Sequence, residues 1–207
     1  MLPNLFHLTT NLMFQHNIND SDPYKRPVFS LGNKIIRVLW KTSWLVLCSW
    51  TPAPFHAWRA LVLRMFGAKL GKANFIYPDC KIWAPWLLET EDVVTIGPNV
   101  EIYNPGGVYL GHHSILSQHA FLCGATHDYN HLDFAYIKKK IYISSYAWIC
   151  SKAIVLPGVR CGEGSVLGAG SVTSKNLEPW MVYTGNPAQC IRQRNNFLLE
   201  NELDPSV

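Results

Sequence analysis

Aliphatic side chains recur at every sixth position along most of this 207-residue chain. A period of six matches neither the 3.6-residue period of an α-helix nor the two-residue period of a lone strand. It matches a coil of triangular cross-section, in which each flat side takes one hexapeptide and three sides complete a turn. The recurring positions are Leu70, Ile76, Ile82 and Leu88; Ile96 and Ile102; Leu110, Leu116 and Leu122; and Ile143, Ile149, Val155, Cys161, Leu167 and Thr173.

Two further features accompany this repeat. Glycine often follows the aliphatic position, as at Gly97, Gly111 and Gly168, which we attribute to the bend of the chain at each corner. The residue four positions on is small or β-branched, and we expect it to fill the narrow interior beside the large side chain. Such residues are Ser114, Ala120, Thr126, Ala147, Ala153, Val159, Ser165 and Ser171. The pattern predicts stacked turns joined as parallel strands, without fixing their handedness.

The repeat is interrupted at three places. It slips by two residues between Leu88 and Ile96 and again between Ile102 and Leu110. A larger gap separates Leu122 from Ile143, where 21 residues replace the expected six. The gap predicts a loop over 127–140 that leaves the coil, and long loops on a rigid scaffold are typical functional segments.

Composition excludes several classes of protein. The net charge of +4 is dispersed, and Lys138–Lys140 is the one dense basic run, which argues against nucleic-acid binding. The six cysteines form no CxxC pair, which favours free thiols in a reducing compartment. The first residues lack a basic region followed by an apolar run, so no secretory signal is expected and a cytoplasmic location is predicted.

An apolar segment over 35–50 complicates that location. It is 16 residues long and contains Arg37 and Lys41, so it is too short and too charged to be a typical membrane-spanning helix. One interpretation is a helix packed on the rest of the domain. The other is a helix lying in a membrane interface, with tryptophans at its apolar boundary, which would place the protein at the inner face of the membrane.

The segment over 148–175 resembles the signature of the hexapeptide-repeat acetyltransferases, which include the galactoside and maltose acetyltransferases. The similarity is closer to acetyltransferases of the colanic-acid-biosynthesis type. It covers about two-thirds of the chain, with THD (126–128) and GNPA (185–188) as fairly specific motifs. The other matching segments are FHAWRALVLRMFGAKLGK (55–72), KIWAPWLLE (81–89), VEIYNPGG (100–107), CGATHDYN (123–130) and EPWMVYTGNPAQCIRQR (178–194).

The resemblance implies an all-β protein built on a left-handed parallel β-helix. We expect an N-terminal extension with helices over 1–68, the coil over 69–186 with its extruded loop, and a C-terminal helix and tail over 187–207. Pro187 is expected to open that last helix at its first position. The resemblance also implies a homotrimer with active sites between neighbouring subunits.

The resemblance assigns catalysis to His127, where the coil is interrupted. Direct transfer from a thioester to a hydroxyl needs a base, and a histidine with a pKa near about 6.5 suits that role. Asn104 is a second candidate, since its amide would hold the acceptor or polarise the thioester carbonyl. The alternative for Asn104 is a turn-favouring residue before Pro105. Asp92 is a weaker candidate for orienting the base, against a solvated side chain.

The site for acetyl-CoA is also taken from the resemblance. The pantetheine arm is expected in a groove between adjacent subunits, and basic residues would contact the negatively charged end of CoA. Relatives often have arginine where this chain has Gln189, and Arg194 is a candidate to compensate. The expected cofactor-binding residues are Trp148, Ser151, Ala169, Ser174, Lys175 and Arg192.

The remaining histidines raise the alternative of a metal enzyme. The related γ-class carbonic anhydrases bind zinc through a His-x4-His pair, which is absent here, so no metal is expected. His112, His113 and His119 are instead expected at a subunit interface or on the surface. The predicted function is acetyl-CoA-dependent O-acetylation of a sugar hydroxyl in polysaccharide or oligosaccharide biosynthesis. Alternatives are N-acetylation of an amino sugar and a non-catalytic trimeric β-helix scaffold.

Overall fold

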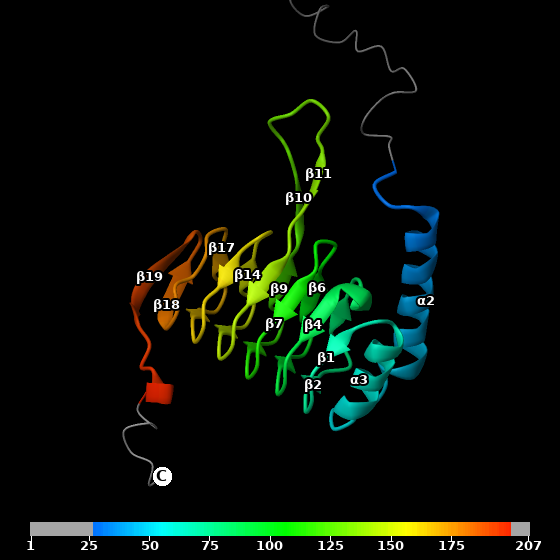
Figure 1. The fold of residues 1–207 in the computed structure, drawn as a ribbon, viewed down its shortest axis with the longest axis horizontal. Coiled ribbons are helices and arrows are strands. Elements are labelled where there is room, and N and C mark those ends of the chain that lie inside the picture. The colour runs from blue at the N-terminus through cyan, green and yellow to red at the C-terminus, as the bar shows by residue number, and fades with distance from the viewer. Residues whose placement is uncertain (1–26, 200–207) are drawn as a thin grey trace, which may run out of the picture.

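The computed structural model describes residues 27–199, so residues 1–26 of the expected N-terminal extension and residues 200–207 of the tail lie outside the described residues. The centre of the molecule is a left-handed β-helix of parallel strands with three faces (Figure 1). Successive strands of the chain step from one face to the next, and each strand pairs with strands one turn away. The predicted fold is therefore confirmed.

The strands of each face are short. The first face holds β1 (Lys69–Leu70), β4 (Leu88–Thr90), β7 (Val108–Leu110), β12 (Ile141–Ile143) and β15 (Arg160–Cys161). The second holds β2 (Phe75–Ile76), β5 (Thr95–Ile96), β8 (Ile115–Leu116), β13 (Trp148–Ile149), β16 (Val166–Leu167), β18 (Met181–Gly185) and β19 (Ala188–Gln193). The third holds β3 (Lys81–Ile82), β6 (Glu101–Tyr103), β9 (Phe121–Cys123), β14 (Ile154–Val155) and β17 (Val172–Thr173). A 3-10 turn, η2 (Pro85–Leu87), precedes β4.

The six-residue repeat forms the core. Every repeat position is buried except Leu70, which is half-buried at the start of the coil. The small residues four positions on are also buried, apart from Thr126, which is exposed because the chain has left the coil by then. Stacking of equivalent aliphatic residues on neighbouring turns excludes water from the whole interior, and this burial stabilises the coil.

The two-residue slips have a structural explanation. On the first face, β4, β7 and β12 are three residues long and each turns two side chains inward. Their inward pairs are aligned by the register, which sets Leu88 and Ile141 opposite Val108, and Thr90 opposite Leu110. The slips are thus longer sides of the triangle, not breaks in the coil.

The glycines that follow the repeat positions are not explained by the bend of the chain at each corner, as was expected. A Cβ at Gly97 would lie 2.7 Å from the carbonyl oxygen of Leu116, and one at Gly111 would lie 2.5 Å from the backbone nitrogen of Ser145. Neither glycine has a positive φ. These glycines are therefore required because the next turn of the coil lies so close to them. They are not required by an unusual backbone conformation at the corner.

Helix α2 (Leu31–Leu47) covers the third face near the start of the coil. Its inner side is fixed by indoles, because Trp40 Nε1 donates to the carbonyl of Ile82 at 2.7 Å and Trp44 Nε1 to that of Pro78 at 3.1 Å. The interpretation of 35–50 as a helix packed on the domain is confirmed. No helix within residues 27–199 has the length and apolar character needed to cross a membrane.

Helix α3 (His56–Met65) is tied to the coil by a buried arginine. The fully buried side chain of Arg59 donates to the carbonyls of Ile76, Pro52 and Ala53 and to the hydroxyl of Thr51. Burial lowers the pKa of this guanidinium. One side chain therefore joins the helix, the turn before it and strand β2.

The C-terminal end differs from the expectation. Residues 188–193 form strand β19, which pairs antiparallel with β18, and the helical turn covers only 197–199 within the described residues. Pro187 lies in the turn between these two strands and does not open a helix. A strand replaces the expected helix because the hairpin gives β18 a hydrogen-bonding partner where the parallel coil stops.

The carboxylate of Glu91 gives a prediction about acid stability. It accepts hydrogen bonds from the Tyr109 hydroxyl at 2.5 Å and from the His112 backbone at 2.8 Å, and these bonds lower the pKa of Glu91. Stability from a lowered carboxyl pKa is present above the unfolded value and is lost as the pH falls through the folded value. We expect the free energy of unfolding to fall below about pH 4.5 and to fall less in Glu91→Gln. Urea titrations across pH 3–7 measure both curves, and parallel curves would contradict this role.

Candidate functional site

The large gap in the repeat is a β-hairpin that projects from the coil (Figure 1). Its strands β10 (Ala125–His127) and β11 (Tyr136–Lys138) are antiparallel, with His127 opposite Tyr136. The chain turns outward at Gly124, whose backbone nitrogen donates to the carbonyl of Tyr103 at 2.6 Å. A Cβ at Gly124 would lie 2.7 Å from that same oxygen, so the exit point requires glycine.

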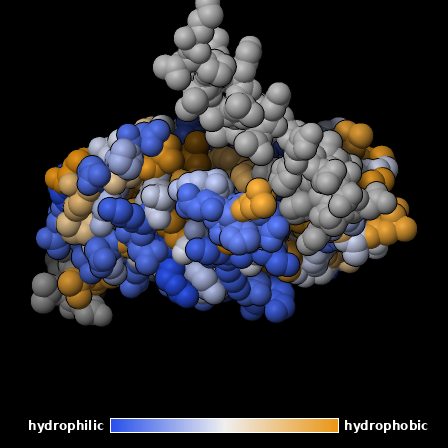
Figure 2. Space-filling view, turned by 90° about the horizontal axis from the view of Figure 1, so that it is seen from above, coloured by the Kyte–Doolittle hydropathy of each residue, from blue (hydrophilic) through white to orange (hydrophobic). Residues whose placement is uncertain are grey.

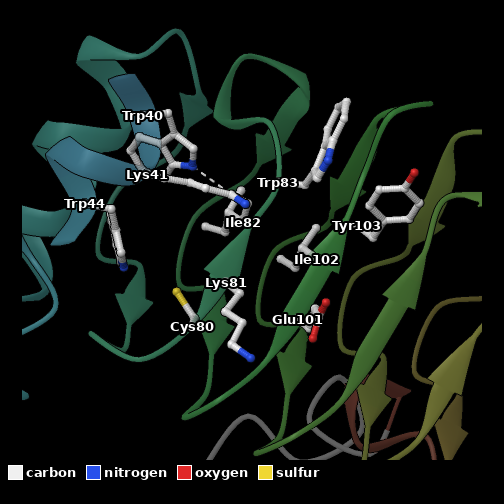
Figure 3. Close-up of a pocket in the computed structure, with 10 residues that line it drawn as sticks. All are labelled: Trp40, Lys41, Trp44, Cys80, Lys81, Ile82, Trp83, Glu101, Ile102 and Tyr103. Atoms are coloured by element: carbon white, nitrogen blue, oxygen red, sulfur yellow. Dashed lines mark hydrogen bonds between the residues drawn. The ribbon is translucent and has the colours of Figure 1, made fainter. Parts of the chain in front are cut away.

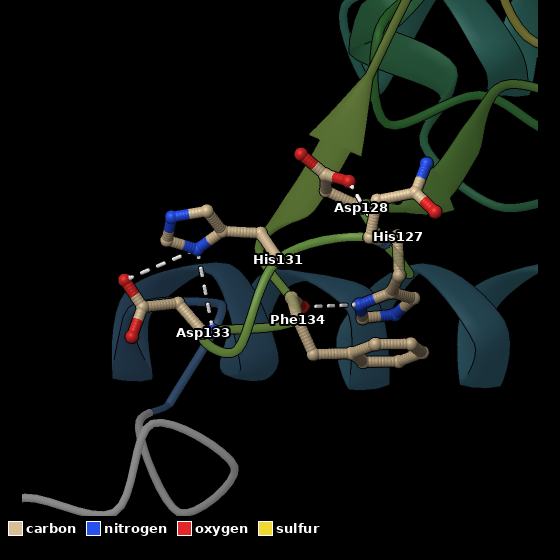
Figure 4. Close-up of polar contacts among 6 residues, drawn as sticks. His127, Asp128, His131, Asp133 and Phe134 are labelled. Atoms are coloured by element: carbon tan, nitrogen blue, oxygen red, sulfur yellow. Dashed lines mark hydrogen bonds and ion pairs between the residues drawn. The ribbon is translucent and has the colours of Figure 1, made fainter.

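The imidazole of His127 is held by its own hairpin. Nδ1 lies 2.9 Å from the carbonyl oxygen of Phe134, and the two rings stack at 4.4 Å with planes 12° apart (Figure 4). A carbonyl only accepts, so Nδ1 carries the proton and the neutral ring keeps its lone pair on Nε2. This tautomer is the one required of a general base acting through Nε2.

The neighbouring acidic residues do not orient that ring. Asp128 accepts from the backbone of Asn130 at 3.1 Å and shapes the tip of the hairpin. Asp133 lies 3.7 Å from His131 Nδ1 (Figure 4). Orientation of His127 therefore comes from the Phe134 backbone carbonyl.

Aromatic side chains join His127 to the coil. The Tyr136 ring meets the His127 ring edge-on at 5.4 Å, and its hydroxyl lies 2.8 Å from that of Tyr103. Burial, with the Tyr103 hydrogen bond, raises the pKa of Tyr136. Trp83 packs on Tyr103 at 5.6 Å, and Phe29 packs on both Trp83 and Tyr136. None of these aromatic residues is a repeat position, so the periodicity gave no signal for them.

A cavity of about 300 Å³ opens beside this aromatic group, between α2 and strands β3 and β6 (Figure 3). Tyr103 forms part of its wall and also bonds to Tyr136, so one ring separates the cavity from the hairpin. Its lining combines tryptophan rings with three charged side chains. The lining residues are Trp40, Lys41, Trp44, Cys80, Lys81, Ile82, Trp83, Glu101, Ile102 and Tyr103.

Asn104 is buried inside the coil. Its amide oxygen accepts from the backbone nitrogen of Ala84 at 3.0 Å, and its amide nitrogen donates to the carbonyl of Ala84 at 2.9 Å. Both ends of the amide are used within the protein, so the structure favours the structural role over contact with a substrate. Asp92 likewise accepts from the backbone of Lys72 at 2.6 Å and braces the first turn.

The expected CoA residues lie at two corners and on the second face of the coil. Ser151 and Ala169 follow β13 and β16, on successive turns of the corner between the second and third faces, where Gly170 donates to the Ser151 carbonyl at 2.9 Å. Trp148 is on β13, 41% exposed, with its indole nitrogen 2.8 Å from the Ser117 hydroxyl. No described contact joins these residues to His127.

The two basic residues of the expected CoA site, Lys175 and Arg192, also lie on different parts of the coil. Ser174 and Lys175 are exposed at the corner after the third face, and exposed Arg192 lies on β19 of the second face. Arg194 does not compensate for Gln189 in this structure. Its guanidinium donates to the carbonyls of Tyr146 and Gly164 at 3.0 and 2.9 Å, which holds it against the coil.

Two of the other histidines, His112 and His113, pack on the ring of Tyr146. His113 stacks on Tyr146 at 5.1 Å, and His112 meets the same ring edge-on at 4.7 Å. Within residues 27–199, no three histidine, cysteine, aspartate or glutamate side chains are grouped to hold a metal ion. All six cysteines are free thiols.

Comparison with curated proteins gives relatives of one kind. The chain is 39% identical over 166 residues to the putative colanic acid biosynthesis acetyltransferase WcaF of Escherichia coli K12, covering 80% of this chain and 91% of that protein. It is 39% identical over 137 residues to a putative acetyltransferase of Schizosaccharomyces pombe, covering 63% and 55% of the two chains. No model of a known protein family matches the chain.

Solved structures share the fold. A hexapeptide-repeat acetyltransferase from Vibrio cholerae superimposes with a TM-score of 0.73 at 21% identity, covering 81% of this chain and 95% of that one. A galactoside acetyltransferase in complex with coenzyme A gives 0.71 at 22% identity, covering 85% and 88%. Together with the coil and the similarity to the Escherichia coli protein, these matches show that the chain belongs to the hexapeptide-repeat acetyltransferases of the colanic-acid-biosynthesis type.

Proposed function

We propose that this protein transfers the acetyl group of acetyl-CoA to a sugar hydroxyl during polysaccharide biosynthesis, with His127 as general base. The observation that carries the proposal is the bond from Nδ1 of His127 to the Phe134 carbonyl, which leaves Nε2 able to take a proton. The name of the Escherichia coli relative supports the class of acceptor. Two solved relatives are complexes with acetyl-CoA and with coenzyme A, which supports the donor.

The reaction needs one proton to move twice. The acceptor hydroxyl gives its proton to Nε2 of His127 as its oxygen attacks the thioester carbonyl carbon. The resulting imidazolium is stabilised by the Phe134 carbonyl at Nδ1. When the tetrahedral intermediate collapses, the carbon–sulfur bond breaks and the imidazolium returns the proton to the CoA sulfur. The products are the O-acetyl sugar and free CoA thiol.

We assign the acceptor to the cavity beside Tyr103. Aromatic rings offer apolar faces with polar edges, and saccharide rings have the same mixed character. Lys41, Lys81 and Glu101 at the cavity supply charged hydrogen-bonding groups for hydroxyls. The Tyr103–Tyr136 bond connects this wall to the hairpin that carries His127.

The active form is proposed to be a homotrimer. The expected CoA residues are spread over two corners and the second face of the coil, and the described contacts bring none of them to His127. A second copy beside the hairpin would supply the missing half of a groove. Because acetyl-CoA is a cytosolic donor, the reaction is placed in the cytoplasm.

The test is release of free CoA thiol from acetyl-CoA with a panel of soluble sugars and amino sugars. Turnover with a neutral sugar supports O-acetylation, and turnover with amino sugars alone would replace it by N-acetylation. Absence of turnover with every acceptor, together with absence of acetyl-CoA binding in calorimetry, would leave the trimeric scaffold as the function.

Trp148 gives a prediction about donor affinity. The exposed indole offers a flat apolar surface to the pantetheine arm, so Trp148→Ala should weaken acetyl-CoA binding by about tenfold. Titration calorimetry measures the Kd. Trp50→Ala removes an equally large exposed ring outside the coil and should leave the Kd unchanged. Equal Kd values for both variants and the unaltered protein would remove Trp148 from the site.

A further inference from the structure

Helix α2 has two apolar sides, and the coil covers only one of them. The inner side carries Trp40, Trp44 and Cys48 against the coil. The outer side carries large aliphatic residues that are each more than half exposed: Leu31, Ile35, Val38, Leu39, Leu45 and Val46. Figure 2 shows apolar side chains gathered at the end of the molecule that carries α2 and α3.

The outer residues form one stripe. Leu31, Ile35, Val38 and Leu45 lie on a single helix face at spacings of three, four or seven residues, with exposed Thr42 between the last two. The helix is 17 residues long, so the stripe extends for about 25 Å. Contiguous apolar surface of this kind marks an interaction site, whereas scattered exposed residues do not.

The charges around the stripe are of one sign. No acidic residue occurs on α2, whereas Lys34, Arg37 and Lys41 do. Exposed Lys34 and Lys41 lie on α2 itself. A second copy of this surface would bring like charges together, but an anionic lipid surface complements them.

Two indoles extend the surface beyond the helix. Trp50 is 72% exposed and Trp58 is 40% exposed. Their ring nitrogens already donate to the carbonyls of Val46 and Leu47, so the exposed rings have no unpaired N–H group to keep in water. Tryptophan beside a basic amphipathic helix is typical of proteins that lie in a membrane interface.

We propose that the outer face of α2, defined by Leu31, Ile35, Val38, Leu39, Leu45 and Val46, docks on the surface of an anionic phospholipid bilayer. The helix lies flat in the interface, with the aliphatic stripe in the lipid and Lys34 among the head groups. The cavity assigned to the acceptor is under the same helix, on its inner side. An acceptor held on a lipid would therefore reach the enzyme at the membrane.

Flotation of the full chain with phosphatidylcholine vesicles, with and without phosphatidylglycerol, tests the proposal. The unaltered protein should float with the anionic vesicles, and high salt should reduce the bound fraction. Val38→Glu combined with Leu45→Glu should weaken vesicle binding by about tenfold or more. Both side chains are exposed, so the melting temperature should stay within a few degrees, about that of a surface change.

A matched control separates position from charge. Leu132→Glu combined with Ile191→Glu adds the same charge at two other exposed aliphatic residues and should leave vesicle binding unchanged. Failure of the unaltered protein to bind anionic vesicles, or equal loss in both double variants, would overturn the proposal. A lower molecular mass in light scattering for the α2 variant would instead make this face a contact between copies. Thiol release with a soluble acceptor, without vesicles, tests the proposed catalysis separately.

Discussion

His127→Ala should lower kcat for acetyl transfer by about 10²- to 10⁴-fold, the contribution typical of a positioned general base. The Kd for acetyl-CoA should remain the same, because the donor is expected along the coil and not on the hairpin. Free thiol release measures the rate, and calorimetry measures the affinity. The rate loss should be largest where the acceptor hydroxyl has the least tendency to ionise unaided.

A second variant separates chemistry from hairpin geometry. His127→Asn keeps a donor that can reach the Phe134 carbonyl but has no basic nitrogen, so it should be as slow as His127→Ala. Phe134→Ala keeps the backbone carbonyl and removes the stacked ring, so it should lose less activity. Full turnover by His127→Ala would exclude the base mechanism whatever the other variants do.

Arg59→Met should lower the free energy of unfolding by about 3–5 kcal/mol, the range for breaking a buried charged network. The arginine has no exposed surface, and its removal takes one donor away from each of three backbone carbonyls and from the Thr51 hydroxyl. Methionine fills much of the volume, so the loss comes from the hydrogen bonds that the guanidinium no longer makes. Urea unfolding monitored by circular dichroism measures the difference.

The control for Arg59 is on the same helix. Arg64 is exposed and donates to the carbonyls of Leu70 and Gly71, so Arg64→Met should cost no more than about 1 kcal/mol. Arg59→Lys keeps the charge but replaces a planar fork by a single ammonium, and it should lose most of the same stability. A loss at Arg59 no larger than at Arg64 would show that the carbonyls find other partners.

The coil was predictable because its core repeats one contact. Ile149 and Leu167 stack in register one turn apart, so burial imposes the same residue type at a fixed interval. The longer first face was not predictable, since β7 turns both Val108 and Leu110 inward, and the change of the six-residue interval from one to the other looks like a slip. The prediction that Pro187 opens a helix was wrong, because proline is common both at helix starts and in turns. The pairing of β18 with β19 determines that Pro187 lies in a turn.

The candidate site was partly predictable for a similar reason. His127 stands where the repeat stops, which the sequence shows directly. The Phe134 carbonyl that holds it has no side-chain signature, and the Tyr103–Tyr136 bond depends on the path of the hairpin back to the coil. The role of Asn104 was ambiguous because a side-chain amide can hydrogen-bond either to a substrate or to the protein backbone. Its two bonds to Ala84 join residues 20 positions apart and have no signature in the sequence.

The β18–β19 hairpin has a consequence for solubility. A coil of parallel strands ends in a row of unpaired backbone groups that would accept another turn, including a turn from a different molecule. Strand β19 runs in the opposite direction, so a further parallel turn finds no continuation of the register there. The reversed strand, with mostly exposed side chains, thus acts as a stop against end-to-end fibre growth, while α2 and α3 close the other end.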